Sequence, residues 1–301
     1  MTLPIAMARA LGLACVLLLS HCTSFAQEPK PLGDREPVLQ SPDRPKSALD
    51  LAEEDIAEPK ENELETDRDS FTPSPRAVGN RRLVAEAAYS FIDNRGVAET
   101  HSFPELLLRY GLTRRIELRV GFNYEVGGAR NSISVAGAEE VADDRGLERA
   151  YTVSYGVKLL LTDHDRWLPV SSLIVMGRTS LSEIEQETDV AATYVFGWEL
   201  PGKWLLDAAI HFNTATDEDD RFVAWSPSVV LKAPIGERWK AHVEYFSSFS
   251  SGRSANFAKH FLSPGVHCLL TPNLELGVRV GWGLNDQSSR FFANAGVGWR
   301  F

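Results

Sequence analysis

Long segments in which apolar and polar residues alternate dominate this sequence from residue 81 onward. Between Ile116 and Val126 every second residue is apolar, and the residues between them are charged, Asn or Gly. The same alternation closes the chain, whose last ten residues read FANAGVGWRF and end on Phe301. Successive side chains of a strand point to opposite faces, so this pattern predicts strands with one apolar and one polar face.

Twelve such segments are expected, and several are longer than the common soluble strand of about 5–6 residues. A tilted strand that crosses a membrane needs about 9–11 residues. The predicted spans are 81–92, 98–111, 115–126, 149–161, 169–178, 189–200, 203–214, 221–233, 238–248, 259–270, 274–283 and 290–301.

The connections alternate between short turns and a set with long polar loops. Pro201-Gly202 and residues 234–237 belong to the short set, whereas residues 127–148 and 179–188 belong to the other. Short turns at one end and long loops at the other are typical of outer-membrane barrels. In hydrocarbon only helices and closed barrels satisfy all backbone polar groups. We therefore expect an all-β fold, an antiparallel transmembrane β-barrel of about 12 strands, over residues 76–301. A soluble secreted β-sandwich is the alternative.

Three prolines fall inside predicted strands: Pro104, Pro227 and Pro264. Proline removes a donor from the ladder of hydrogen bonds. We expect bulges or shifted strand ends at these positions.

The first 26 residues predict a secretory signal peptide. The apolar run 10–20 follows Arg9 and precedes Ser24-Phe25-Ala26, a small-x-small cleavage site. The run is too short for a membrane helix, which needs about 20 residues. An alternative is a lipoprotein with lipidated Cys22, although His21 departs from the lipobox pattern.

Residues 27–75 predict an acidic, mostly disordered periplasmic arm. Residues 27–69 contain 14 acidic and 6 basic residues, a net charge of −8, with six prolines and no aromatic residue. Such a segment cannot bury enough apolar surface to offset its ordering entropy. The acidic balance also disfavours a nucleic-acid partner.

A further hypothesis places residues 66–75 in the periplasmic mouth as a plug. Phe71 would anchor the plug, and Asp67 and Asp69 would meet Arg119 or Arg300.

Several motifs carry a family resemblance: TDRDSFTP at 66–73, THSFPELLLRYGLT at 100–113, WSPS at 225–228, LLTPN at 269–273 and GLND at 283–286. Over residues 66–301 the sequence resembles the outer-membrane transporters of the "MetA-pathway of phenol degradation" family. The resemblance implies a barrel that passes small aromatic or apolar compounds, and it implies no catalytic residue. Phe301, with Trp299 and Val297, resembles the C-terminal signal that the barrel-assembly machinery recognises.

Charged and polar residues on the polar faces are candidates for the lumen. They either pair across strands and fill a narrow lumen, or line a solute path whose mixed charges set selectivity. The candidates are Glu86, Glu105, Arg109, Glu117, Arg119, Asn123, Glu125, Lys158, Glu199, Asp207, His211, Lys240, His242, Glu244, His267, Glu275, Arg279 and Arg300.

We expect no enzymatic activity, no cofactor and no metal. His101 and His260 lie near Ser102 and Ser263, but neither pair has the signature of a barrel hydrolase. The predicted function is passive passage of small solutes through the outer membrane of a Gram-negative bacterium. The expected partners are outer-membrane lipid, the barrel-assembly machinery and a small-molecule solute. The alternative is a non-conducting structural or adhesive barrel with acidic extracellular loops.

Overall fold

The computed structural model describes residues 64–68, 70–134, 148–181, 188–217, 220–251 and 256–301. Within these residues no helix is long and apolar enough to cross a membrane. One short 3-10 turn, η1 (Pro201–Lys203), interrupts the strands. The strands are β1 (Leu83–Asp93), β2 (Thr100–Gly111), β3 (Ile116–Gly127), β4 (Glu148–Thr162), β5 (Val170–Ser180), β6 (Thr188–Leu200), β7 (Trp204–Asp217), β8 (Asp220–Ile235), β9 (Trp239–Ser251), β10 (Ala258–Thr271), β11 (Leu274–Gly283) and β12 (Phe291–Arg300).

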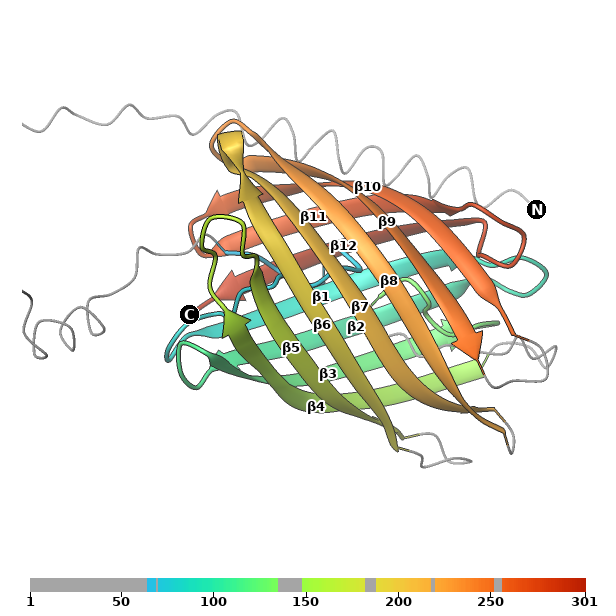
Figure 1. Ribbon diagram of the computed structural model, residues 1–301. Helices are drawn as coiled ribbons and strands as arrows, with labels where there is room; N and C mark the ends of the chain where they lie inside the picture. The colour runs from blue at the N-terminus through green and yellow to red at the C-terminus, as the bar shows by residue number, and fades with distance from the viewer. Residues whose placement is uncertain (1–63, 69, 135–147, 182–187, 218–219, 252–255) are drawn as a thin grey trace, which may run out of the picture. The chain divides into compact units, whose positions relative to one another are not determined.

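These strands form one closed antiparallel barrel, in which each pairs with its neighbours in sequence and β12 pairs with β1 (Figure 1). The closing pair runs from Val84 opposite Arg300 to Asp93 opposite Phe291. The amide of Phe301 donates to the carbonyl of Leu83 over 2.8 Å. The predicted fold class and strand count are therefore confirmed. The residues of the predicted arm before Leu64 lie outside the described part.

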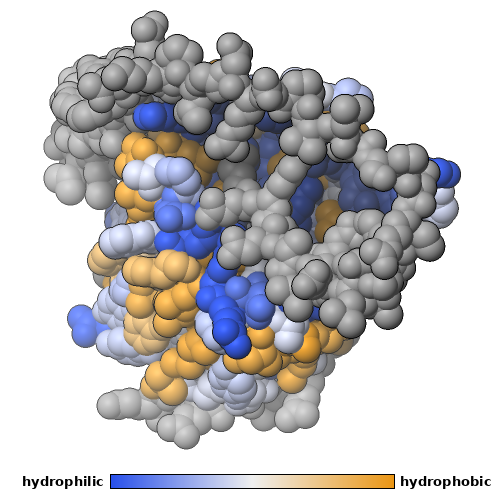
Figure 2. Space-filling model, turned by 90° about the vertical axis from the view of Figure 1, so that its left-hand side faces the viewer, coloured by the Kyte–Doolittle hydropathy of each residue, from blue (hydrophilic) through white to orange (hydrophobic). Residues whose placement is uncertain are grey.

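The barrel carries its apolar residues outside and its polar residues inside. In β3 Leu118 and Val120 are 39% and 51% exposed, whereas Glu117 and Arg119, which alternate with them, are buried. This is the reverse of a soluble core, and it follows from the period-two alternation of the sequence. Figure 2 shows apolar residues gathered on the outside of the strands and hydrophilic residues around the hollow at the centre.

The two ends of the barrel differ. We call the end with the connections after β2, β4, β6, β8 and β10 the turn end, and the opposite end the loop end. Gly202 and Gly236 have φ values of 79° and 71° in two turns, a region that glycine enters without strain. The connection between the predicted strands 203–214 and 221–233 is shorter than expected, because β7 runs to Asp217 and β8 begins at Asp220.

The prolines within strands disturb the hydrogen-bond pairing of neighbouring strands. The expected register shift occurs at one of the three positions. The β2–β3 register shifts between Ser102 and Glu105, around Pro104. Next to Pro227 and Pro264 the pairing of β8 with β9 and of β10 with β11 is interrupted, but the register is the same on both sides of the gap. Those two prolines therefore interrupt the pairing without a bulge.

Candidate functional site inside the barrel

A segment that precedes the first strand lies inside the barrel. We call residues 64–68 and 70–76 the inserted segment. The hydroxyl of Thr66 donates to Glu275 on β11 over 2.8 Å, and that of Thr72 donates to Ser228 on β8 over 2.8 Å. Contacts to strands from different parts of the ring require an interior position. All residues of the segment are buried except Glu65 and Arg76, which are half-buried.

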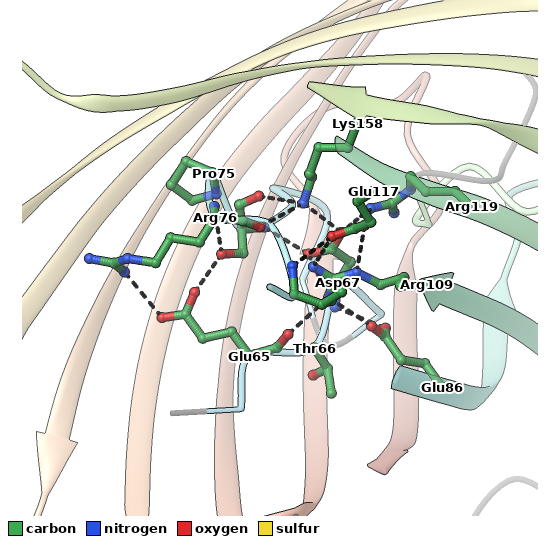
Figure 3. A network of polar contacts seen from close by, with 12 residues as sticks. Glu65, Thr66, Asp67, Pro75, Arg76, Glu86, Arg109, Glu117, Arg119 and Lys158 are labelled. Atoms are coloured by element: carbon green, nitrogen blue, oxygen red, sulfur yellow. Dashed lines mark hydrogen bonds and ion pairs between the residues drawn. The ribbon is translucent and has the colours of Figure 1, made fainter. Parts of the chain in front are cut away.

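Asp67 is the centre of a buried ion cluster near the turn end (Figure 3). Its carboxylate lies 2.7 Å from Arg119 Nη1, 3.2 Å from Lys158 Nζ and 3.5 Å from Arg109 Nη1. Glu117 receives two hydrogen bonds from Arg109, at 2.9 and 3.2 Å, and Glu86 receives one at 3.0 Å. Burying charges is tolerable only when they are paired in good geometry.

The residues of the barrel strands, which we call the wall, leave the formal charge of this cluster unbalanced. Arg109, Arg119 and Lys158 carry three formal positive charges, and Glu86 and Glu117 carry two negative charges. Asp67 supplies the third negative charge. Burial acts to raise the pKa of Asp67, but the attraction of the three cations outweighs it and holds the pKa well below its usual range. The inserted carboxylate therefore completes a neutral cluster.

Hydrogen bonds also join the beginning of the inserted segment to its end. The amide of Ser74 donates to Asp67 Oδ1 over 2.9 Å, and its hydroxyl donates to Glu65 over 2.5 Å. Burial acts to raise the pKa of Glu65, but Lys232 and Arg76 lead the groups that lower it to about 2. Lys158 donates to the carbonyl of Ser74 over 2.8 Å. The segment is thus a folded loop fastened at its base.

The tip of the loop is held by Glu244 of β9. The carboxylate accepts from the amides of Phe71 and Thr72 at 2.9 and 2.7 Å, and from Arg279 Nη1 at 3.2 Å. The ring of Phe71 stacks on Phe246 with a centroid distance of 4.4 Å and an interplanar angle of 8°. One buried carboxylate therefore binds two backbone donors and an arginine.

A second insertion enters between β3 and β4. The side-chain amide of Asn131 donates to Glu105 Oε1 over 2.7 Å, while Arg68 of the inserted segment lies 3.7 Å from Glu105 Oε2. Arg279 donates to the carbonyl of Ile133 over 2.6 Å. Residues 128–134 and the inserted segment are therefore joined through shared side chains of the wall.

Most of the candidate lumen residues are buried within the ring. Two candidates are not fully buried. The side chain of Glu199 is 55% exposed, and it lies 3.6 Å from Arg76. Lys240 is half-buried. The buried candidates are Glu86, Glu105, Arg109, Glu117, Arg119, Asn123, Glu125, Lys158, Asp207, His211, His242, Glu244, His267, Glu275, Arg279 and Arg300.

The contacts expected of the plug hypothesis are present in part. Asp67 meets Arg119, and Phe71 is buried among aromatic rings. Arg300 donates to the turn after β10, to Asn273 Oδ1 at 3.0 Å and the carbonyl of Pro272 at 3.1 Å. Asp69 lies outside the described residues. The arm predicted to be mostly disordered up to residue 75 is packed in the barrel from Leu64.

Sequence reasoning missed several contacts of the site. Thr66, Thr72 and the loop residue Asn131 carry no signal of their own, because short polar residues are common in loops. The pair of His242 Nδ1 and His267 Nε2, 2.5 Å apart, was also missed. The two residues lie on adjacent strands β9 and β10 but are offset in register, so spacing along the sequence does not reveal them.

The two serine–histidine neighbours considered for hydrolysis do not form catalytic pairs in the described structure. His101 and His260 each contact a tyrosine hydroxyl over 2.8 Å, those of Tyr89 and Tyr245. The hydroxyl of Ser263 donates to the carbonyl of Val280. These histidines therefore belong to tyrosine pairs between neighbouring strands.

Comparison with known proteins decides the family. The family model described as "Putative MetA-pathway of phenol degradation" matches residues 66–301. The chain belongs to this family. The match begins at Thr66, so it includes most of the inserted segment as well as the strands. It confirms the resemblance that the sequence motifs indicated.

A solved structure with low sequence identity shows the same fold. The COG4313 outer membrane channel from Pseudomonas putida F1 is 15% identical, with a TM-score of 0.51 over 79% of this chain and 100% of that chain. The NanC porin is 9% identical, with a TM-score of 0.46 over 72% and 98%. The translocator domain of the autotransporter NalP from Neisseria meningitidis is 8% identical, with a TM-score of 0.45 over 73% and 88%. The comparison with curated proteins gave no match. The fold of this family member is that of an outer-membrane β-barrel.

Proposed function

We propose that this protein is an outer-membrane channel of a Gram-negative bacterium for passive passage of small aromatic or apolar solutes. The observation that supports this best is a closed barrel with an apolar exterior whose polar interior is occupied by a loop of its own chain. The inserted segment acts as a plug, and its displacement opens the path. No step in this function requires a catalytic residue, a metal or a cofactor.

The family supports the class of solute. Its description names phenol degradation, and such a pathway consumes aromatic compounds that must first cross the outer membrane. The lumen adds an apolar cluster to a mainly charged interior, formed by Phe71, Ile92, Ile133, Phe246, Phe261 and Phe292. A path lined by apolar rings and by charged side chains suits small solutes that have an apolar ring and a polar substituent.

Liposome swelling with a panel of sugars, amino acids and phenols tests the proposal. We expect phenols to enter faster than sugars of similar size, and deletion of residues 27–75 to raise single-channel conductance. Unchanged conductance after the deletion would remove the plug hypothesis. A barrel that shows no conductance, with or without residues 27–75, would instead support a structural or adhesive role.

The C-terminal strand is proposed to recruit the barrel-assembly machinery. The rings of Trp299 and Phe301 stack at 4.9 Å and are 54% and 63% exposed, so neither is needed to fill a core. We expect replacement of both by Ala to lower the folded, heat-modifiable fraction in cells severalfold. Phe103→Ala is the matched control, because Phe103 is 59% exposed on another strand. Equal folded fractions in both variants would contradict the role.

A further inference from the structure

The ring of Phe71 occupies a seat that other elements of the barrel build. Phe246 of β9 stacks against one face, with a centroid distance of 4.4 Å and an angle of 8° between the planes. His211 of β7 packs against the same ring at 4.9 Å and 69°. A nearly parallel ring and a nearly perpendicular ring are both arrangements that aromatic pairs prefer. The seat therefore matches a flat, six-membered aromatic ring.

The seat belongs to an apolar cluster within an interior that also contains many buried polar and charged residues. Phe246 packs on Phe261 at 4.8 Å, and Phe292 lies 6.0 Å from Phe246. Arg279 lies over the ring of Phe292, 5.5 Å from its centroid. An apolar site with a few polar groups is the usual form of a site for small molecules.

His211 offers a polar group beside this seat. Its Nδ1 lies 2.9 Å from the hydroxyl of Thr193, while its Nε2 has no hydrogen-bond partner among the described residues. The residue is 3% exposed. A buried polar atom without a partner is uncommon, and each instance calls for an explanation. A hydroxyl on a bound ring would supply the missing hydrogen bond.

Phe71 is not part of the barrel strands that form its seat. Its ring belongs to the inserted segment, whereas Phe246 and His211 belong to strands. Its backbone is held by one hydrogen bond from its own amide to Glu244, and the next residue provides a second. A side chain tethered beside a binding site competes with free ligand at a high effective concentration.

We propose that the Phe71 seat is a binding site for a small planar aromatic molecule with one hydroxyl, and that Phe71 is its intramolecular competitor. The solute takes the place of the Phe71 ring between Phe246 and His211, and its hydroxyl pairs with His211 Nε2. The role of this exchange in passage rests on the proposed function, but binding itself does not.

Phenol binding to the full barrel in lipid nanodiscs tests the site, with empty nanodiscs subtracted. We expect Phe71→Ala to bind phenol about tenfold more tightly than the wild type, because the competitor no longer occupies the seat. Phe71→Leu keeps an apolar side chain without a flat ring, and its affinity should lie between the two. Phe103→Ala, on the outer surface, should match the wild type and controls for partition into lipid.

Two further measurements separate a specific seat from a loosened plug. Cyclohexanol keeps the hydroxyl but lacks the flat ring, and it should bind Phe71→Ala about tenfold more weakly than phenol does, since stacking is lost. His211→Phe in the Phe71→Ala background should weaken phenol binding, because the hydroxyl loses its partner. The proposal is overturned if Phe71→Ala binds phenol no more tightly than the wild type, or if phenol and cyclohexanol bind equally. Because nanodisc binding requires no passage, a failure of the transport proposal would appear only in swelling.

Discussion

Asp67→Asn is expected to turn a mostly closed barrel into a mostly open one. The substitution keeps the size of the side chain but removes the negative charge between Arg109, Arg119 and Lys158. Three cations would then share two wall carboxylates in a buried cluster. Removing one partner from a buried ion pair typically destabilises by about 3–5 kcal/mol. Because 1.4 kcal/mol is a factor of ten, the population of displaced segment should rise by roughly a hundredfold or more.

Single-channel recording in planar bilayers measures this change as open probability. The matched control is Asp163→Asn, the same substitution in the ion pair with Arg115, where both side chains are more than half exposed. An exposed pair contributes about 0–1 kcal/mol, so the control should conduct like the wild type. A lower thermal stability of Asp67→Asn with unchanged open probability would show that the cluster stabilises the barrel without closing it.

A double substitution separates the charge from other effects of the variant. Arg119→Met in the Asp67→Asn background removes one of the unbalanced cations, which contacts Asp67 and the strand residue Glu117. If the charge imbalance displaces the segment, the second substitution should restore part of the closed population, which a double-mutant cycle quantifies. Additive effects of the two substitutions would indicate that the residues act independently.

The strands could be predicted from the sequence because a barrel in lipid imposes one rule on every residue. A residue such as Leu118 must face lipid and its neighbour Glu117 must face inward, so periodicity alone locates each strand to within a few residues. The rule does not apply to strand ends that extend beyond the part of the barrel in contact with lipid. Residues 215–217 are polar or small and were expected in a loop, yet they pair with β8. Backbone ladders continue there because hydrogen bonding does not depend on side-chain polarity.

The candidate site was predictable only where charge pointed to it. Asp67 and Arg119 have opposite charges, and a plug at the mouth brings them together. Thr72 and Ser228 are 156 residues apart, and only closure of the ring and the path of the inserted segment bring them into contact. Asn131 reaches Glu105 for the same reason. Contacts between neutral polar residues thus depend on the three-dimensional path, about which the sequence pattern carries no information.

A disulfide between the inserted segment and the wall should close the path reversibly. The hydroxyls of Thr72 and Ser228 are 2.8 Å apart, so cysteines at these positions would place their sulfur atoms within reach of each other. We expect Thr72→Cys with Ser228→Cys, when oxidised, to reduce phenol uptake in liposome swelling to the level of empty vesicles. Uptake should return after treatment with dithiothreitol. Cys268 must be replaced by Ser in all variants, because it is the one cysteine outside the predicted signal peptide.

Two single-cysteine variants provide the controls for this experiment. Thr72→Cys and Ser228→Cys alone cannot form the internal cross-link, so oxidation and reduction should leave their uptake unchanged. The cross-linked fraction is read from gel mobility before swelling. If uptake stays at the wild-type rate in fully cross-linked protein, solutes pass without displacement of the tip, and the inserted segment would line the path instead of closing it. If uptake is lost and restored with the disulfide, movement of the residues around Phe71 is required for passage.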